Sequence, residues 1–137
     1  MRLALSALLL AATMTAPALA QNTQRFDGNW IVTLTCAAMS DGTKGYTFTF
    51  PATVHGGQLH GEHGTRGQGA WLEVDGPIQP DGSATLLVNG LTNRVDYTVG
   101  RLATGTPYSY HVLARFGAGS GQGERVEARA CNLRFTR

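Results

Sequence analysis

Short segments of alternating apolar and polar residues, separated by glycines, constrain this chain more than any other feature. All 18 glycines lie after residue 20, and they interrupt every window in which an apolar stripe with helical spacing could continue. The clearest segment, residues 44–55, alternates Tyr46, Phe48 and Phe50 with threonines. Because successive side chains of a strand point to opposite faces, this segment predicts a strand with one buried face. We therefore expect an all-β protein with helix as a minor component.

Eight strands follow from this alternation, and their connections contain residues that favour turns. Gly56-Gly57 predicts a tight hairpin, and Pro80-Asp81-Gly82 predicts a turn. Pro51 lacks a backbone N–H and predicts a bulge or a local gap in pairing, whereas the glycine-rich residues 117–123 are expected to form a flexible loop. The predicted strands comprise residues 26–36, 44–55, 58–63, 70–78, 83–88, 95–99, 107–116 and about 124–137.

The last predicted strand changes the parity of its apolar residues part-way along. A bulge near Ala130 would turn both sets of apolar residues toward the core. The two sets are Val126, Ala128 and Ala130, and Cys131, Leu133 and Phe135.

The first 20 residues have the pattern of a cleaved signal peptide. Arg2 precedes an apolar run over residues 3–12, and Ala18-Leu19-Ala20 supplies small residues for cleavage after Ala20. The alternative is a retained membrane anchor, but the run is shorter than the roughly 20 residues that span a bilayer. We expect a periplasmic or secreted protein whose residues 21–137 form one soluble domain, with no membrane association after cleavage.

The charge of the processed chain argues against a nucleic-acid partner. Without Arg2, ten basic side chains face nine acidic ones, and no basic cluster stands out. We expect a monomer that contacts an unknown protein or glycan partner.

Two cysteines, Cys36 and Cys131, predict a disulfide in an oxidising compartment. Placing them opposite each other in an antiparallel pair brings Trp30 opposite Arg137, so the first and last strands become neighbours. Neighbouring terminal strands in a meander of about eight strands predict a closed up-and-down β-barrel, with Trp30 and Arg137 as a pair at one barrel end. A β-sandwich with paired end strands is the alternative.

The sequence contains no recognisable catalytic motif. We therefore predict that the protein is not an enzyme and has no catalytic residues and no cofactor. His55, His60 and His63 are weak candidates for metal ligands, because His60 and His63 point to opposite faces of a strand. We therefore predict no metal site. Trp71, Glu73 and Asp75 share one strand parity. They form either an outward patch that recognises a partner or, if the phase is wrong, a segment in which Trp71 is buried.

The inward-phased aromatic residues allow two interpretations. They fill a narrow barrel completely, or they line a pocket at one mouth, where tyrosine hydroxyls would need partners. The set comprises Trp30, Tyr46, Phe48, Phe50, Tyr97, Tyr108, Tyr110, Phe116 and Phe135.

Two resemblances bear on fold and location. Gly28-Asn29-Trp30 resembles the Gly-x-Trp signature of lipocalins and avidins, in which the tryptophan closes one barrel end; no ligand contacts carry over. Over nearly the whole processed chain, the sequence resembles a family of small secreted bacterial β-barrel domains of unknown function. The matching segments are FDGNW at 26–30, GYTF at 45–48, LHG at 59–61, IQPDGSA at 78–84, GTPY at 105–108 and CNL at 131–133.

These observations lead us to expect an exported, non-enzymatic binding or interaction module. One alternative is a calycin-like barrel that holds a small apolar ligand. Another is a protein resembling the periplasmic inhibitors of secreted proteases, although their cysteines lie closer together than Cys36 and Cys131 do.

Overall fold

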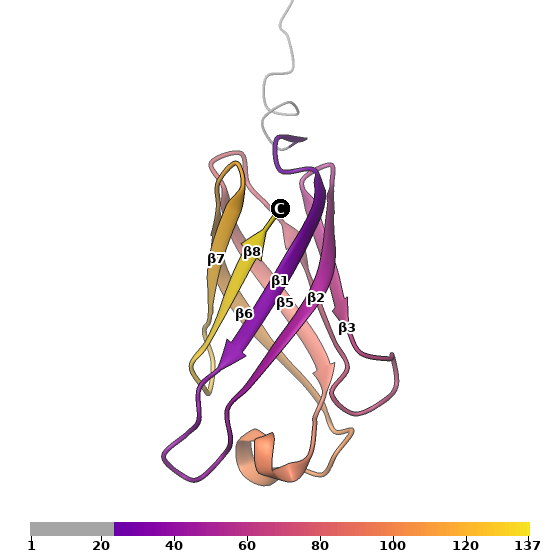
Figure 1. The fold of residues 1–137 in the computed structure, drawn as a ribbon, viewed down its shortest axis with the longest axis vertical. Coiled ribbons are helices and arrows are strands. Elements are labelled where there is room, and N and C mark those ends of the chain that lie inside the picture. The colour runs from indigo at the N-terminus through magenta and orange to yellow at the C-terminus, as the bar shows by residue number, and fades with distance from the viewer. Residues whose placement is uncertain (1–23) are drawn as a thin grey trace, which may run out of the picture.

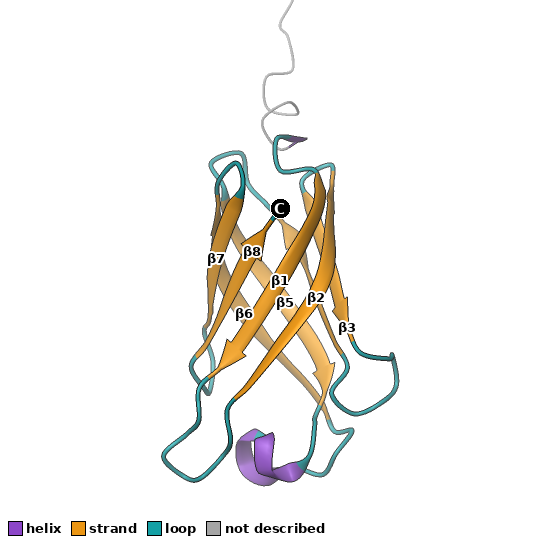
Figure 2. Ribbon diagram, in the orientation of Figure 1, coloured by secondary structure: helices purple, strands orange, loops and turns teal. Residues whose placement is uncertain are grey.

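The computed structural model describes residues 24–137, which form one closed antiparallel barrel (Figure 1). The predicted signal peptide, residues 1–20, lies outside the described residues. Each strand pairs with the next, and β8 returns to pair with β1. Figure 2 shows helix in the connection 92–106 and in a short piece at the start of the described residues. The strands are β1 (Gly28–Cys36), β2 (Tyr46–His55), β3 (Gln58–His63), β4 (Leu72–Pro77), β5 (Ser83–Leu91), β6 (Pro107–Phe116), β7 (Ser120–Arg125) and β8 (Cys131–Thr136).

The closure of the barrel follows the predicted register. Cys36 lies opposite Cys131 in the β1–β8 pair, and the two form a disulfide across 95 residues of sequence. The pairing continues to Ile31 opposite Thr136. The barrel prediction is therefore confirmed, and the sandwich alternative is not the fold.

The interior is filled by the predicted alternate residues. In β1, Trp30, Val32, Leu34 and Cys36 are all buried, whereas Ile31 is exposed. An eight-stranded barrel has an interior just wide enough for side chains, so these residues form a packed core. Of the described residues, no helix is long and apolar enough to cross a membrane.

Both ends of the described chain lie at the same end of the barrel (Figure 1). An aromatic plug closes this end. Phe26 and Trp30 are fully buried there, and the indole N–H of Trp30 donates a hydrogen bond to the Phe26 carbonyl at 2.8 Å. The guanidinium of Arg137 lies 4.7 Å from the Trp30 ring centroid, so the predicted barrel-end pair is in contact. Arg137 also donates to the backbone oxygens of Arg25 and Asp27, which holds the N-terminal segment across this end.

The turn predictions hold locally. Gly56 and Gly57 have φ values of 57° and 77°. A two-residue hairpin with a type I′ turn requires such positive φ values at both central residues. Pro51 pairs with Ile31 without a bulge, while the β2–β3 pairing stops at Ala52, so the gap in pairing is the correct alternative. β5 extends to Leu91, three residues beyond its predicted end.

The prediction of a strand at residues 95–99 is wrong. This segment forms two short 3-10 helices, η1 (Val95–Tyr97) and η2 (Val99–Arg101). The Thr98 hydroxyl donates to the Arg94 carbonyl at 3.0 Å, and the Lys44 N–H donates to the Asp96 carbonyl at 2.8 Å. These contacts use backbone groups that a strand would have given to neighbouring strands.

The missing strand is β7, which begins inside the segment 117–123 predicted as a flexible loop and continues to Arg125. Gly121 and Gly123 occupy inward positions where a side chain would collide. A Cβ on Gly123 would lie 2.7 Å from Val112 Cγ1, and one on Gly121 would lie 2.9 Å from Phe116 Cδ1. The glycines therefore serve close packing inside the barrel and are not loop residues.

The predicted continuous strand 124–137 is also wrong. The chain turns between β7 and β8, and Ala128 adopts a φ of 69°. Val126, Ala128 and Ala130 are exposed, so no bulge brings them to the core. Arg129 is the buried residue of this turn, with 4% of its surface exposed.

Candidate functional site

Four connections meet at the barrel end opposite the aromatic plug (Figure 1). They are residues 37–45, 64–71, 92–106 and 126–130, and the third carries η1 and η2. We call this end the mouth. The connections of the mouth surround a space that the core side chains do not fill.

A cavity of about 190 Å³ lies at the mouth. Its walls are mainly aromatic and aliphatic, with Tyr46, Phe48 and Tyr108 from the strands and Val99 and Leu102 from the connection 92–106. Both predictions for the aromatic residues are thus partly right. The plugged end is filled, and the mouth holds a pocket.

Tyr108, in the wall of this pocket, stacks on Tyr110 of the same strand. The rings of Tyr108 and Tyr110 are nearly parallel, with centroids 6.0 Å apart. Burial raises the pKa of both phenols, so both hydroxyls stay protonated at neutral pH and can donate hydrogen bonds. The Tyr110 hydroxyl is buried and has no hydrogen-bond partner among the described residues.

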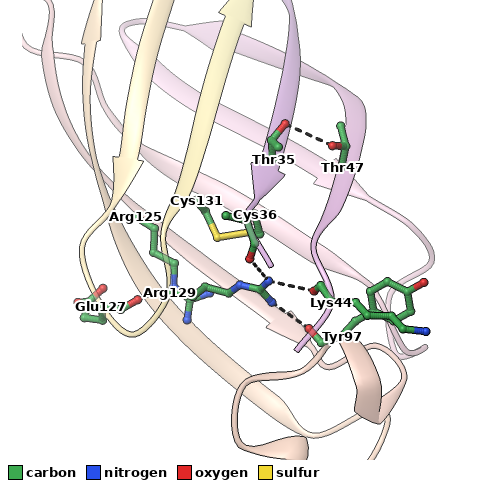
Figure 3. The surroundings of a disulfide bond; sticks show 10 residues. Thr35, Cys36, Lys44, Thr47, Tyr97, Arg125, Glu127, Arg129 and Cys131 are labelled. Atoms are coloured by element: carbon green, nitrogen blue, oxygen red, sulfur yellow. Dashed lines mark hydrogen bonds between the residues drawn. A yellow bond between two sulfur atoms is a disulfide. The ribbon is translucent and has the colours of Figure 1, made fainter. Parts of the chain in front are cut away.

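Arg129 ties the connections of the mouth together (Figure 3). Its guanidinium donates to the carbonyls of Ala37, Lys44 and Tyr97, which belong to two other connections. Burial lowers the pKa of Arg129, because a guanidinium removed from water loses part of the hydration that favours its charged form. Its Nε has no partner among the described residues. Arg129 therefore holds the connections 37–45 and 92–106 against the β7–β8 turn, next to the disulfide.

Arg125 is the second cation in the lining, at the end of β7. Its guanidinium lies 3.9 Å from the Tyr110 ring centroid, and its Nε donates to the Glu127 carbonyl at 2.6 Å. Among residues 24–137, no carboxylate lies within ion-pair distance of Arg125 or Arg129. The charged groups of the lining are thus both positive.

The connection 92–106 is held in place at both ends. The Thr92 hydroxyl donates to the Ala103 carbonyl at 2.6 Å and accepts from the Thr106 N–H at 2.8 Å.

Three residues of the mouth have positive backbone φ values: Ala70 at 68°, Arg101 at 51° and Ala128 at 69°. They are the non-glycine residues with positive φ in the described chain, and all lie in connections of the mouth. Such backbone strain is concentrated at functional sites in many proteins.

The predicted histidine candidates do not converge. His55 is exposed beside its hairpin, and the ring of His63 stacks on Phe48 at 3.8 Å. His60 lies on the outer face, where its Nδ1–H donates to Asp75 at 2.5 Å and the paired carboxylate raises the pKa of His60. His60, Glu73 and Asp75 could hold a metal ion by spacing, but Arg66 already pairs with Glu73 at 2.9 Å.

Of the two interpretations of Trp71, the structure supports the buried one, so Trp71 does not join Glu73 and Asp75 in an outward patch. Leu72 and Val74 face the core as expected, yet only 8% of the Trp71 surface is exposed. The Arg66 guanidinium covers its ring at 4.6 Å, and its indole N–H donates to Glu62 at 2.6 Å. The strand phase was right, but the connection 64–71 folds back over the indole.

Comparison of this chain with protein-family models, curated proteins and solved structures finds no match.

Sequence reasoning missed Arg125 and Arg129. Both lie in the segment that the sequence predicts as one continuous strand, about 124–137. The one available signal is the parity change near Ala130, which predicts a bulge but corresponds to the turn between β7 and β8.

Proposed function

We propose that this chain is an exported, non-enzymatic protein that binds a small, mainly apolar ligand at the barrel mouth. The observation that carries the proposal is the aromatic-walled cavity of about 190 Å³ at one end of an otherwise packed barrel. Export is supported by the signal-peptide pattern of residues 1–20 and by the Cys36–Cys131 disulfide.

The size and walls of the cavity favour a compact ligand. A dry apolar cavity of roughly 150 Å³ accommodates a benzene molecule, so this cavity suits a molecule built around one ring or a short branched chain. Ligand sites in proteins are commonly concave and apolar, with a few polar groups that orient the ligand. The tyrosine hydroxyls and the two arginines supply those polar groups.

The mouth is ordered before a ligand arrives. Arg129 joins two connections to the β7–β8 turn, and Thr92 closes the connection 92–106 on itself. A preformed site favours affinity, because little conformational entropy is lost on binding. This supports a binding role for the mouth over one in which the connections are merely loose surface.

The alternative of a protein or glycan partner on the outer face has less support. Its anchor was an exposed Trp71, and aromatic anchors contribute much of the energy of such interfaces. The burial of Trp71 under Arg66 removes that anchor.

The test is titration of the processed protein with p-cresol, a neutral one-ring compound, followed by two-dimensional NMR. We expect shifts concentrated on the backbone amides of Tyr46, Phe48 and Tyr108. The variant Leu102→Asp places a carboxylate in the apolar wall and should weaken binding at least tenfold. Leu113→Asp makes the same change at a comparably exposed leucine on the outer face of β6 and should leave binding unchanged.

Two results would contradict the proposal. One is an absence of saturable shifts at the mouth. The other is equal weakening by Leu102→Asp and Leu113→Asp, which would show a nonspecific effect of charge.

A further inference from the structure

We infer that the ligand of the mouth is a compact anion whose carboxylate, or a similar oxyanion, pairs with Arg125. The inference rests on the proposed function and adds the chemical class of the ligand. It depends on the charge balance of the mouth and on which arginine is free to bind.

The charge balance of the lining favours a negative group. Arg125 and Arg129 are the charged residues of the cavity wall, and no described carboxylate pairs with either. An unneutralised cation at a partly buried site attracts an anion more strongly than the same cation in water, because the local dielectric constant is lower. A ligand oxyanion would supply the missing counter-charge.

Arg125 is the arginine that is available to a ligand. Arg129 already donates from both terminal nitrogens to carbonyls of the chain. Arg125 uses only its Nε, toward the Glu127 carbonyl, and its two terminal nitrogens have no hydrogen-bond partner among the described residues. These nitrogens form one edge of the planar fork that binds carboxylates through two parallel hydrogen bonds.

Tyr110 holds this fork in position. The guanidinium of Arg125 lies 3.9 Å from the Tyr110 ring centroid. At this distance the negative face of the ring attracts the cation and holds it over the ring. Tyr110 itself is 1% exposed, and its hydroxyl lacks a partner. Arg129 Nε, in the cavity wall, is a second buried polar atom without a partner. The cavity wall thus combines a cation held against an aromatic ring with one buried N–H, that of Arg129 Nε, whose hydrogen-bonding capacity is unused.

The volume restricts the anion to a small molecule. A cavity of about 190 Å³ accepts one ring and a short acidic side chain. The ligand class is therefore an aryl-alkanoic or branched short-chain carboxylate. A long-chain fatty acid would extend beyond this cavity.

The experiment compares phenylacetate with phenylacetamide, which has the same shape and no charge, by calorimetric titration at neutral pH. We expect the wild-type protein to bind phenylacetate at least tenfold more tightly than the amide. Arg125→Gln should reduce that preference to within about twofold, whereas the control Arg134→Gln, at an exposed position on the outer face of β8, should retain it. Arg125→Lys keeps the charge without the fork and should fall between the two.

Different failures separate this inference from the function on which it rests. If phenylacetate and phenylacetamide bind equally to the wild type, or if Arg125→Gln leaves the preference intact, the anion class is wrong while ligand binding at the mouth stands. If neither these compounds nor p-cresol binds, the proposed function falls and the ligand class falls with it.

Discussion

The disulfide joins the one pair of strands that are distant in sequence, and its removal has a calculable effect. Every other pairing links strands that are consecutive in sequence, whereas β1 and β8 become neighbours only when the barrel closes. In the chain-entropy model, a bridge over 95 residues destabilises the unfolded state by about 4–5 kcal/mol at 25 °C. We therefore expect the variant Cys36→Ala/Cys131→Val to lose most of that free energy of unfolding.

The paired substitution keeps the interior filled. Cys36 and Cys131 are 2% and 5% exposed, so two alanines would add the cost of a cavity to the cost of the missing bridge. Valine at one position replaces most of the lost sulfur volume. For a domain of this size, about 4 kcal/mol corresponds to a fall in the midpoint of thermal unfolding of roughly 15–20 °C.

The assay is guanidinium unfolding of the oxidised wild type, the reduced wild type and the double variant, with fluorescence and circular dichroism as probes. The reduced wild type is the control, and it should match the double variant to within about 1 kcal/mol. A loss below about 1 kcal/mol in both proteins, with an unchanged barrel, would refute the reasoning. It would mean that the unfolded chain already holds its ends together.

Two further predictions concern packing and pH. Gly123→Ala should destabilise the protein by about 1–3 kcal/mol in chemical unfolding, because the new Cβ would lie 2.7 Å from Val112 Cγ1. The control Gly119→Ala, which has open space around it, should leave the free energy of unfolding unchanged. Equal effects of the two substitutions would contradict a strand role for the glycines of β7. Asp75→Asn should lower the raised pKa of His60 toward 6.5 in a proton NMR titration. Because the folded-state pKa is raised, this ion pair stabilises the fold fully below the unfolded-state value and loses its effect as pH rises through the folded-state value; an unchanged pKa in Asp75→Asn would rule out the pair as its cause.

Two errors in the predicted strands share one cause. Glycine in a sequence usually indicates a turn, yet Gly121 and Gly123 lie within a strand because Phe116 and Val112 fill the space beside them. Conversely, Val95 and Tyr97 have the composition of a strand but form a 3-10 turn. In both cases the contacts that decide the conformation come from residues outside the local segment.

The candidate site was less predictable than the fold for the same reason. Arg129 acts through the carbonyls of Ala37, Lys44 and Tyr97, which are 92, 85 and 32 residues away in sequence. No local pattern encodes these contacts. Trp71 differs, because Arg66, which covers its ring, belongs to the same connection, 64–71.

The sequence by itself determined the class of fold, the phase of β1 and the register of its closure with β8. These properties depend on the two-residue period of a strand and on the positions of Cys36 and Cys131, and both can be read without coordinates. Only the tertiary structure decided that the barrel end opposite the Trp30–Arg137 pair holds a cavity with Arg125 in its wall. That arrangement arises from side chains and backbone groups of distant connections, whose meeting depends on the complete barrel.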